Sequence, residues 1–406
     1  MPHPATRRPV LFLHVPKTAG TSFLTVLCNV FGDAHVRRLD REGELEPAFI
    51  DRLVAGGLDG IDCLAGHIPA HLFMGRLAGF RPFTLLRDPV DRVMSLFRFT
   101  RAASPLEQAR VGLAPGFGFE AFMACRHPEV FGQVENGMCR MLCGDPAAND
   151  PATDEFWRPS DPMRWLNQAV AMLHRCEVGL VEDMPGTLAV ARRAWGVPFA
   201  LEAARENASI ELARLGNDPE QSPGEALRVV QRNTLDLALH RTARDLFARR
   251  RAAAAGHGAE CAMAPAHAVA GTRLNLSEIP CRRGFHPYER DGFGWFQAGA
   301  DALVAFDAGP SPLRLSLNLY RVSEAYPAGG LAVALNGVPV PVRVVATAGP
   351  WVELETGPFR PIAGMNLLAL RPAYSVPVRF LNPSTLDNRD LSMALATLGF
   401  LAGSPP

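Results

Sequence analysis

The first 250 residues alternate short apolar runs with longer segments of helical period. The run 10–15 predicts a buried strand, and a turn containing glycine leads from it into a helix over about 21–31. The run 83–86 predicts a second strand, which is followed by a helix after Pro89. Further helices are predicted around 162–174, 185–195 and 224–250. This alternation is typical of a parallel sheet with helices on both faces.

The hydrophobic period changes to two beyond residue 272. Leucines alternate with mostly polar residues over 313–320, and Asn336-Gly337 between two apolar runs is typical of a type I′ hairpin. Short runs continue at the spacing of an antiparallel sandwich, at 303–306, 351–355, 365–370 and 378–381. We therefore expect an α/β domain over 1–250, an Ala- and Gly-rich linker over 251–272, and an all-β sandwich over 273–406.

Composition narrows the function classes. The 406 residues include 41 Lys+Arg and 41 Asp+Glu, and 48% are hydrophobic, which excludes a disordered chain. Because the charge is balanced, there is no chain-wide electrostatic case for binding nucleic acid or an acidic membrane. Any bound anion must therefore meet local cations.

The eight cysteines are scattered and have neither zinc-site nor disulfide-framework spacing, so we expect no metal and a reducing compartment. The apolar run 10–15 is too short for a signal peptide, and no stretch approaches the roughly 18 to 20 apolar residues of a transmembrane helix. These features favour a cytoplasmic location.

The turn after the first strand carries the first chemical signal. It reads PKTAGTS over residues 16–22 and enters a helix, so backbone N–H groups and the helix dipole converge there as an anion site. Lys17 adds charge, and Thr21 and Ser22 add hydroxyls. It is not a Walker A loop, because Lys17 precedes the one glycine, Gly20. An ordinary kinase is therefore disfavoured.

Lys17 is the one lysine of the chain, and the other 40 of the 41 cationic residues are arginine. Codon bias explains one stray lysine. The alternative is that this position needs a compact ammonium that a planar guanidinium does not replace.

A second segment, LLRDPVDRVMSLF over residues 85–97, repeats the order of strand, turn and helix. Arg87 at the carboxyl end of the strand and Ser95 on the helix are suited to hold a second phosphate. The alternative is that Arg87 forms a turn ion pair with Asp88.

Together the two motifs resemble the 5′-phosphosulfate loop and the 3′-phosphate motif of PAPS-dependent carbohydrate sulfotransferases, which include the heparan sulfate 2-O-sulfotransferases and bacterial relatives. The resemblance covers roughly residues 8–250, with further echoes at 136–144, 178–182 and 233–236. It implies a P-loop-like α/β fold and in-line transfer of a sulfuryl group from PAPS to a glycan or glycolipid hydroxyl. The residues it assigns to the 5′-phosphosulfate are Lys17, Thr18, Ala19, Gly20, Thr21 and Ser22, and those for the 3′-phosphate are Arg87 and Ser95.

The acceptor hydroxyl needs a base, and His67 follows the short apolar run ending at Gly66. The corresponding segment of the 2-O-sulfotransferases has two histidines in the order H-G-H, whereas this chain has Ala65 in the first position. The alternative is a structural histidine at a strand end. His14 is expected inside the first strand with a structural role.

Two other functions stay open at this point. A lectin-like or scaffold protein could carry a degenerate nucleotide fold, and an atypical nucleotide kinase is the third candidate. The sandwich aromatics Phe285, His286, Tyr288, Trp295 and Phe296 fit either a sugar-stacking surface or, more commonly for such residues, a core.

Overall fold

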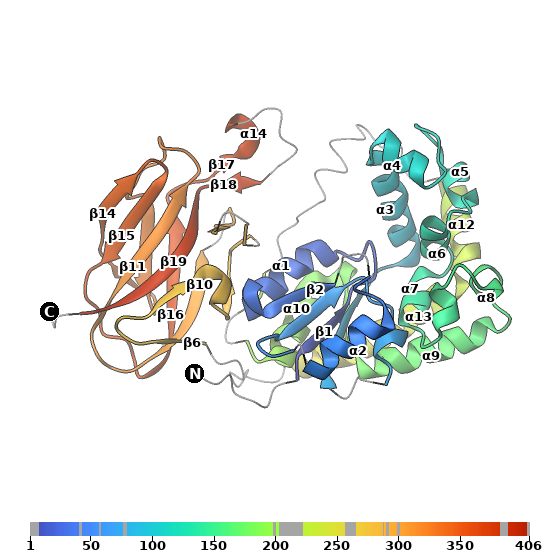
Figure 1. Cartoon of the computed structure of the whole chain (residues 1–406), viewed down its shortest axis with the longest axis horizontal. Helices are drawn as coiled ribbons and strands as arrows, with labels where there is room; N and C mark the ends of the chain where they lie inside the picture. The colour runs from blue at the N-terminus through green and yellow to red at the C-terminus, as the bar shows by residue number, and fades with distance from the viewer. Residues whose placement is uncertain are drawn as a thin grey trace. The chain divides into compact units, whose positions relative to one another are not determined.

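The chain forms two compact units in the computed structural model (Figure 1). Unit 1 comprises residues 1–22, 37–194 and 205–258, and unit 2 comprises residues 23–36, 195–204 and 259–406. Within these units the structure describes residues 8–39, 43–56, 58–75, 79–197, 200–202, 222–255, 265–286, 288–289, 292–298, 301–381 and 389–403.

Unit 1 is built on a five-stranded sheet in the order β2-β3-β1-β4-β5. The pairs β3–β1, β1–β4 and β4–β5 are parallel. The central strand is apolar and buried along its whole length, as expected for a strand covered on both faces. The strands are β1 (Val10–Leu13), β2 (Val36–Leu39), β3 (Cys63–Gly66), β4 (Arg81–Leu86) and β5 (Glu177–Leu180).

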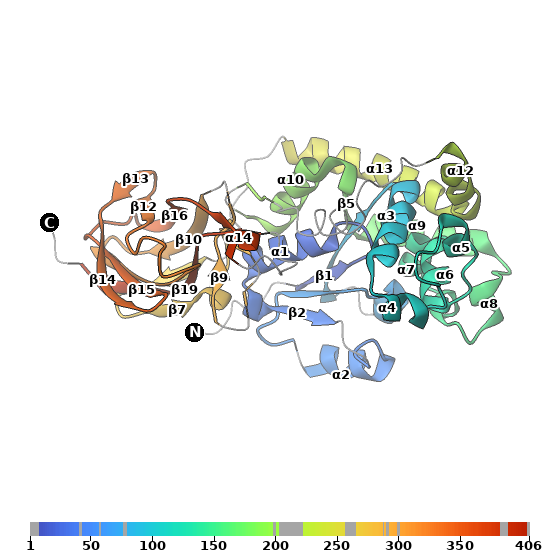
Figure 2. The same cartoon turned by 90° about the horizontal axis from the view of Figure 1, so that it is seen from above.

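Helices cover both faces of this sheet. Figure 2 shows α2 on one side and α10 and α13 on the other. The described helices of unit 1 are α2 (Pro47–Gly56), α3 (Pro89–Ala102), α4 (Pro105–Arg110), α5 (Phe119–Ala124), α6 (Pro128–Val134), α7 (Gly137–Leu142), α8 (Asp154–Trp157), α9 (Pro162–Arg175), α10 (Met184–Trp195), α12 (Pro223–Arg232) and α13 (Thr234–Ala255). The α/β architecture predicted from the pattern of apolar runs is confirmed.

Unit 2 contains a β-sandwich of two sheets, as predicted. One has the strand order β13-β12-β16-β10-β6, with β8 also paired to β10, and the other has β14-β15-β11-β19-β7, with β9 also paired to β19. Asn336 and Gly337 have φ of 49° and 81° and join β12 to β13. These strands are β6 (Ala266–Ala268), β7 (Arg273–Asn275), β8 (Arg282–Arg283), β9 (Gly294–Trp295), β10 (Ala302–Ala308), β11 (Leu313–Arg321), β12 (Leu331–Leu335), β13 (Val338–Val340), β14 (Val342–Ala348), β15 (Trp351–Thr356), β16 (Gly364–Pro372) and β19 (Met393–Ala402).

The core of the sandwich takes up most of the aromatic residues that were open to a sugar-stacking role. Phe285, Phe296, Trp295 and His286 are each less than 8% exposed, and Phe285 and Phe296 pack within the core cluster of the two sheets. Tyr288 is partly buried against the same cluster. These side chains therefore stabilise unit 2 by burying apolar area.

Two local predictions are wrong. The run 378–381, predicted as a strand, forms the one-turn helix α14 (Val378–Leu381) after the short strand β17 (Val376–Pro377), which pairs with β18 (Asp390–Leu391). The predicted helix 224–250 is two helices, because the Asn233 side chain bonds the Val134 carbonyl and ends α12. At the ends of the predicted linker 251–272, α13 continues to Ala255 and β6 begins at Ala266, and residues 256–264 lie outside the described residues. Alanines at 252–255 are strong helix formers, which accounts for the longer helix.

Unit 2 also includes a helical segment from the first 250 residues. Helix α1 (Gly20–Phe31) begins in unit 1, whereas residues 23–36 and 195–204 cluster with the sandwich. In unit 2, the Asp33 carboxylate pairs with Arg282 and accepts the Tyr288 N–H at 3.0 Å. A single cut in the chain therefore does not separate the two units.

Removing the carboxylate of Asp33 should destabilise unit 2. The Arg282 side chain is 1% exposed, so Asp33→Ala leaves a buried guanidinium without its anion, at a cost of about 3–5 kcal/mol. Asp33→Asn keeps an acceptor for the Tyr288 N–H and should cost less. Thermal unfolding of both variants measures the difference, and equal melting temperatures for wild type and Asp33→Ala would contradict this role of the ion pair.

Candidate functional site

Three predicted site segments meet at one edge of the sheet in unit 1. The register places Leu13, the last residue of β1, beside Gly66 of β3 and beside Thr84 of β4. The Thr84 hydroxyl donates to the Leu13 carbonyl at 2.9 Å and fixes this alignment. The residues that follow each strand therefore emerge side by side, at the edge where open α/β sheets bind ligands.

The loop between β1 and α1 has an unusual backbone. Lys17 and Ala19 have φ of 67° and 59°, in the left-handed region that non-glycine residues rarely adopt. The buried Thr18 between them donates its hydroxyl to the Val15 carbonyl at 2.7 Å. Left-handed residues of this kind are found in concave anion sites, where successive N–H groups turn toward one point. Such strain persists where the surroundings hold it in place, and it clusters at functional sites.

Gly20 is the first residue of α1, and its lack of a side chain is required by a neighbour. A Cβ at this position would lie 1.8 Å from Nε2 of His14, and the three nearest atoms all belong to the His14 ring. The backbone of Gly20 is not in the left-handed region. The close approach of His14, and not an unusual φ, therefore explains the glycine.

The ammonium of Lys17 lies over an aromatic ring of helix α3. Its Nζ is 4.0 Å from the centroid of Phe99, whose side chain is 54% exposed. A cation over a ring face is attracted by the ring quadrupole. Phe99 is one helical turn beyond Ser95, so α3 presents both residues on one face.

Arg87 follows β4 and reaches the same loop. Its Nη1 lies 3.5 Å from the Lys17 carbonyl. The Asp88 carboxylate caps α3 by accepting the N–H groups of Val90 and Asp91, at 2.9 and 3.3 Å. Asp88 is thus committed to the helix N-terminus, which disfavours the turn ion pair with Arg87. Ser95 is 9% exposed on the first half of α3.

His67 directly follows β3 and is exposed at the same edge. Its Nδ1 lies 3.0 Å from the carbonyl of His14, and the two imidazole rings stack with centroids 4.2 Å apart. Strand β1 ends at Leu13, so His14 lies just beyond the strand and not inside it as predicted. The structure therefore brings together Lys17, Arg87, His67 and the unpredicted His14.

Glu182, just beyond β5, connects the β4–α3 turn to helix α13. One carboxylate oxygen accepts the Asp88 N–H, and the other lies 3.6 Å from Nε2 of His240. Partial burial raises the pKa of the Glu182 carboxyl, but His240 and the Asp88 N–H outweigh it and lower that pKa below its ordinary value. Glu182 belongs to the segment 178–182 of the family resemblance, but its role was not predicted from the sequence.

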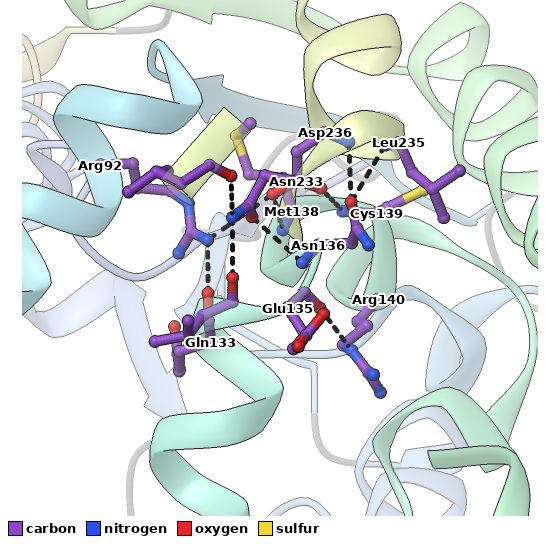
Figure 3. Close-up of polar contacts among 12 residues, drawn as sticks. Arg92, Gln133, Glu135, Asn136, Met138, Cys139, Arg140, Asn233, Leu235 and Asp236 are labelled. Carbon is purple, nitrogen blue, oxygen red and sulfur yellow. Dashed lines mark hydrogen bonds and ion pairs between the residues drawn. The ribbon is translucent and has the colours of Figure 1, made fainter. Parts of the chain in front are cut away.

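A buried polar cluster holds helices α7 and α13 beside α3 (Figure 3). Asn136, with φ of 54°, accepts the N–H groups of Leu235 and Asp236, and its own N–H donates to Asn233 at 3.1 Å. The Asp236 carboxylate in turn accepts the N–H groups that begin α7, from Met138 at 3.0 Å and Cys139 at 2.8 Å. The segments 136–144 and 233–236, which the sequence analysis singled out, thus cap each other's helices.

Arg92 of α3 completes the cluster and lies near Arg87. Its side chain is fully buried, with Nη2 3.6 Å from Asp236 and 2.5 Å from the Gln133 carbonyl (Figure 3). Burial lowers the pKa of Arg92, Asp236 acts in the opposite direction, and the positive charge of Arg87 lowers it further. A Cβ on Gly137 would lie 2.9 Å from the guanidinium, so the small residue is required there.

Comparison with known proteins assigns the first part of this site to a family. Residues 5–129 match the model described as the sulfotransferase family. This part of the chain is therefore similar to the sulfotransferase family. The match includes the Lys17 loop, His67, Arg87 and Ser95, and it supports sulfuryl transfer as the general class of chemistry. No curated protein matches the chain.

Solved structures share only limited similarity with the chain. A ruminal GH26 endo-beta-1,4-mannanase is 16% identical over 29% of this chain and 21% of its own length, with a TM-score of 0.20. The CBM35 from Cellvibrio japonicus Abf62 is 17% identical over 35% of this chain and 90% of its own, also at 0.20. The Xyl-CBM35 in complex with a glucuronic acid containing disaccharide is 18% identical over 35% and 91%, at 0.19. TM-scores of this size establish no shared fold.

The described residues contain neither a membrane-spanning helix nor a cluster of metal ligands. No described helix is long and apolar enough to cross a membrane. The same residues contain no group of three or more His, Cys, Asp or Glu arranged to hold a metal ion.

The stability that Glu182 contributes should depend on pH. Because its pKa is lowered on folding, the contribution is complete above the unfolded value of 4.5 and is lost as the pH falls through the folded value. Glu182→Gln should therefore lower the melting temperature more at about pH 6 than at about pH 3.5. A difference between wild type and variant that is constant over this range would contradict the assignment.

Proposed function

We propose that the protein transfers a sulfuryl group from PAPS to a hydroxyl of a glycan or glycolipid. The observation that carries this proposal is the meeting of the strained Lys17 loop, Arg87 and His67 at one edge of the sheet, within a region that matches the sulfotransferase family. The proposal assigns an anion cradle, a second phosphate contact and a base to these three elements.

The residues present suit a doubly phosphorylated donor. The N–H groups of residues 17–22 fit the 5′-phosphosulfate, because the left-handed residues turn them toward one point and α1 adds its dipole. Arg87 and Ser95 fit the 3′-phosphate, since a guanidinium and a hydroxyl both donate to phosphate oxygens. PAPS would supply the sulfuryl group, bonded to an oxygen of its 5′-phosphate.

Two side chains of the protein act on the proton and the charge that the transfer reaction displaces. His67 accepts the proton of the acceptor hydroxyl as that oxygen bonds to sulfur. Lys17 neutralises the charge that develops on the phosphate oxygen as its bond to sulfur breaks. The site thus acts by holding the reactants in line and by stabilising charge, as in phosphoryl transfer.

The other parts of the proposal concern acceptor and location. We assign the sandwich of unit 2 a role in docking the glycan or glycolipid, and the scattered cysteines favour a cytoplasmic location. For these roles we propose a sulfotransferase domain over 1–250, a linker over 251–272 and a sandwich domain over 273–406.

Transfer of label from PAPS carrying sulfur-35 to a panel of glycans and glycolipids tests the proposed function. We expect label in at least one hydroxyl-bearing acceptor and none when His67→Asn replaces the wild type. Absence of label from every acceptor, with a folded protein that does not bind PAPS, would reject the proposal.

Lys17→Ala should abolish turnover but keep much of the affinity for adenosine 3′,5′-bisphosphate, because the backbone N–H groups remain and the ammonium acts on the developing charge. Lys17→Arg should also be poor. The rates and calorimetric affinities of both variants measure this split. Near-normal activity of Lys17→Arg would show that a compact charge is not required and that codon bias suffices.

Arg87→Ala should raise the KM for PAPS, since the 3′-phosphate is bound but does not react. Loss of a charge-assisted contact costs roughly 1.5 to 3 kcal/mol, or about ten- to a hundredfold in KM. Steady-state kinetics at saturating acceptor measure the change. An unchanged KM would assign the 3′-phosphate to other residues.

Replacing His67 by Ala or Asn should abolish sulfation and leave the fold and bisphosphate binding intact. The wild-type rate should rise with pH as the imidazole base loses its proton. Rate profiles against pH and calorimetry provide the test. An active variant with a flat profile would give His67 a structural role.

A further inference from the structure

The site contains a second histidine from a different strand than the sequence led us to expect. Ala65 occupies the position of the first histidine in the related H-G-H pair, and it is buried in β3. The ring that stacks on His67 is instead that of His14, with centroids 4.2 Å apart and an interplanar angle of 29°. Leu13 and Gly66 are in register at the ends of β1 and β3, and the residue that follows each of them is a histidine. His14 and His67 therefore lie side by side.

Main-chain bonds at these strand ends determine how His67 is oriented. The His14 N–H donates to the Gly66 carbonyl at 3.0 Å, and the His14 carbonyl lies 3.0 Å from Nδ1 of His67. A carbonyl only accepts hydrogen bonds, so this contact requires the proton on Nδ1. In the neutral ring, Nε2 then carries the lone pair that a base needs.

The His14 ring also packs against the donor loop. Its Nε2 occupies the space next to Gly20 where a Cβ would come within 1.8 Å. The ring of Phe12, two residues earlier, is nearly parallel at 5.5 Å. His14 thus lies between the start of α1 and the ring of His67.

The surroundings keep the His14 imidazole neutral. Burial, together with the nearby cationic groups His67, Lys17 and Arg38, lowers its pKa to about 3. These groups come from the strand ends, the loop and β2, so each of these elements opposes a positive charge on His14. A neutral ring stacked on His67 adds no repulsion when His67 takes up a proton.

We propose that His14 is a positioning residue, whose uncharged ring is packed between Gly20 and His67 and holds the base at a fixed place relative to the donor loop. This inference rests on the proposed role of His67 as the base. The ring acts through His67 and not on the reactants.

Two substitutions of His14 test whether this position needs a planar ring or only a side chain of similar volume. His14→Phe keeps a neutral ring that stacks, and it should retain kcat within about threefold of wild type. His14→Leu keeps bulk without a π face, and it should lose roughly two- to tenfold in kcat and shift the pH profile of kcat, with the KM for PAPS unchanged. Both variants keep the main-chain bond to His67.

A double-mutant cycle tests the packing between Gly20 and His14. Gly20→Ala should lower kcat more than about tenfold in the wild-type background, because its Cβ displaces the ring. In the His14→Ala background the ring is absent, so the same change should cost at least about fivefold less in kcat than it does in the wild-type background. Additive losses in the cycle would overturn the inference.

Three further outcomes would reject the proposed role of His14 or that of His67. If His14→Phe loses as much as His14→Leu and the KM for PAPS rises in both, His14 contacts the donor directly and is not a positioning residue. Equal kcat and pH profiles for all three proteins would leave His14 a purely structural residue and reject the inference. If His67→Asn stays active while bisphosphate binds normally, the proposed base is wrong, and that failure is recognised separately from the results for His14.

Discussion

The site depends on the position of β1 between β3 and β4 in a parallel sheet. Leu13 is in register with Gly66 and with Thr84, and the chain leaves β1, β3 and β4 at the same edge of the sheet, with β4 two residues longer. The Lys17 loop follows β1, His67 follows β3, and Arg87 follows β4. The Thr84 hydroxyl, which donates to the Leu13 carbonyl at 2.9 Å, helps to fix this register.

Glu182 and a buried polar cluster hold the segments that follow these strands in place. Glu182 holds the turn before α3 from the side of β5, and the Asn136, Asn233 and Asp236 caps fix α7 against α13. Arg92 extends this polar cluster to α3, the helix that carries Ser95 and Phe99. A buried ion pair of this kind is weak evidence for stability by itself, but loss of one partner is costly. The cluster therefore gives α3 a defined position beside the donor loop.

Local motifs explain how much of this was predictable from the sequence. The strand–loop–helix order around Lys17 and Arg87 depends on residues close together in the chain, and the structure has both elements where the pattern predicts them. The contact between His14 and His67 joins residues 53 positions apart, and Glu182 meets Asp88 over 94 positions. Such contacts follow from strand order, which periodicity does not give. The same reason accounts for residues 23–36 clustering in unit 2 through Asp33 and Arg282.

The central claim is that the Lys17 loop and Arg87 together bind a nucleotide with both a 5′- and a 3′-phosphate. Calorimetric titration of the full chain with adenosine 3′,5′-bisphosphate, and separately with ATP, tests this claim most directly. We predict binding of the bisphosphate and weak or absent binding of ATP, which lacks the 3′-phosphate. Preferential binding of ATP would identify a nucleotide kinase, and binding of neither would identify a degenerate nucleotide fold; both results would contradict the account.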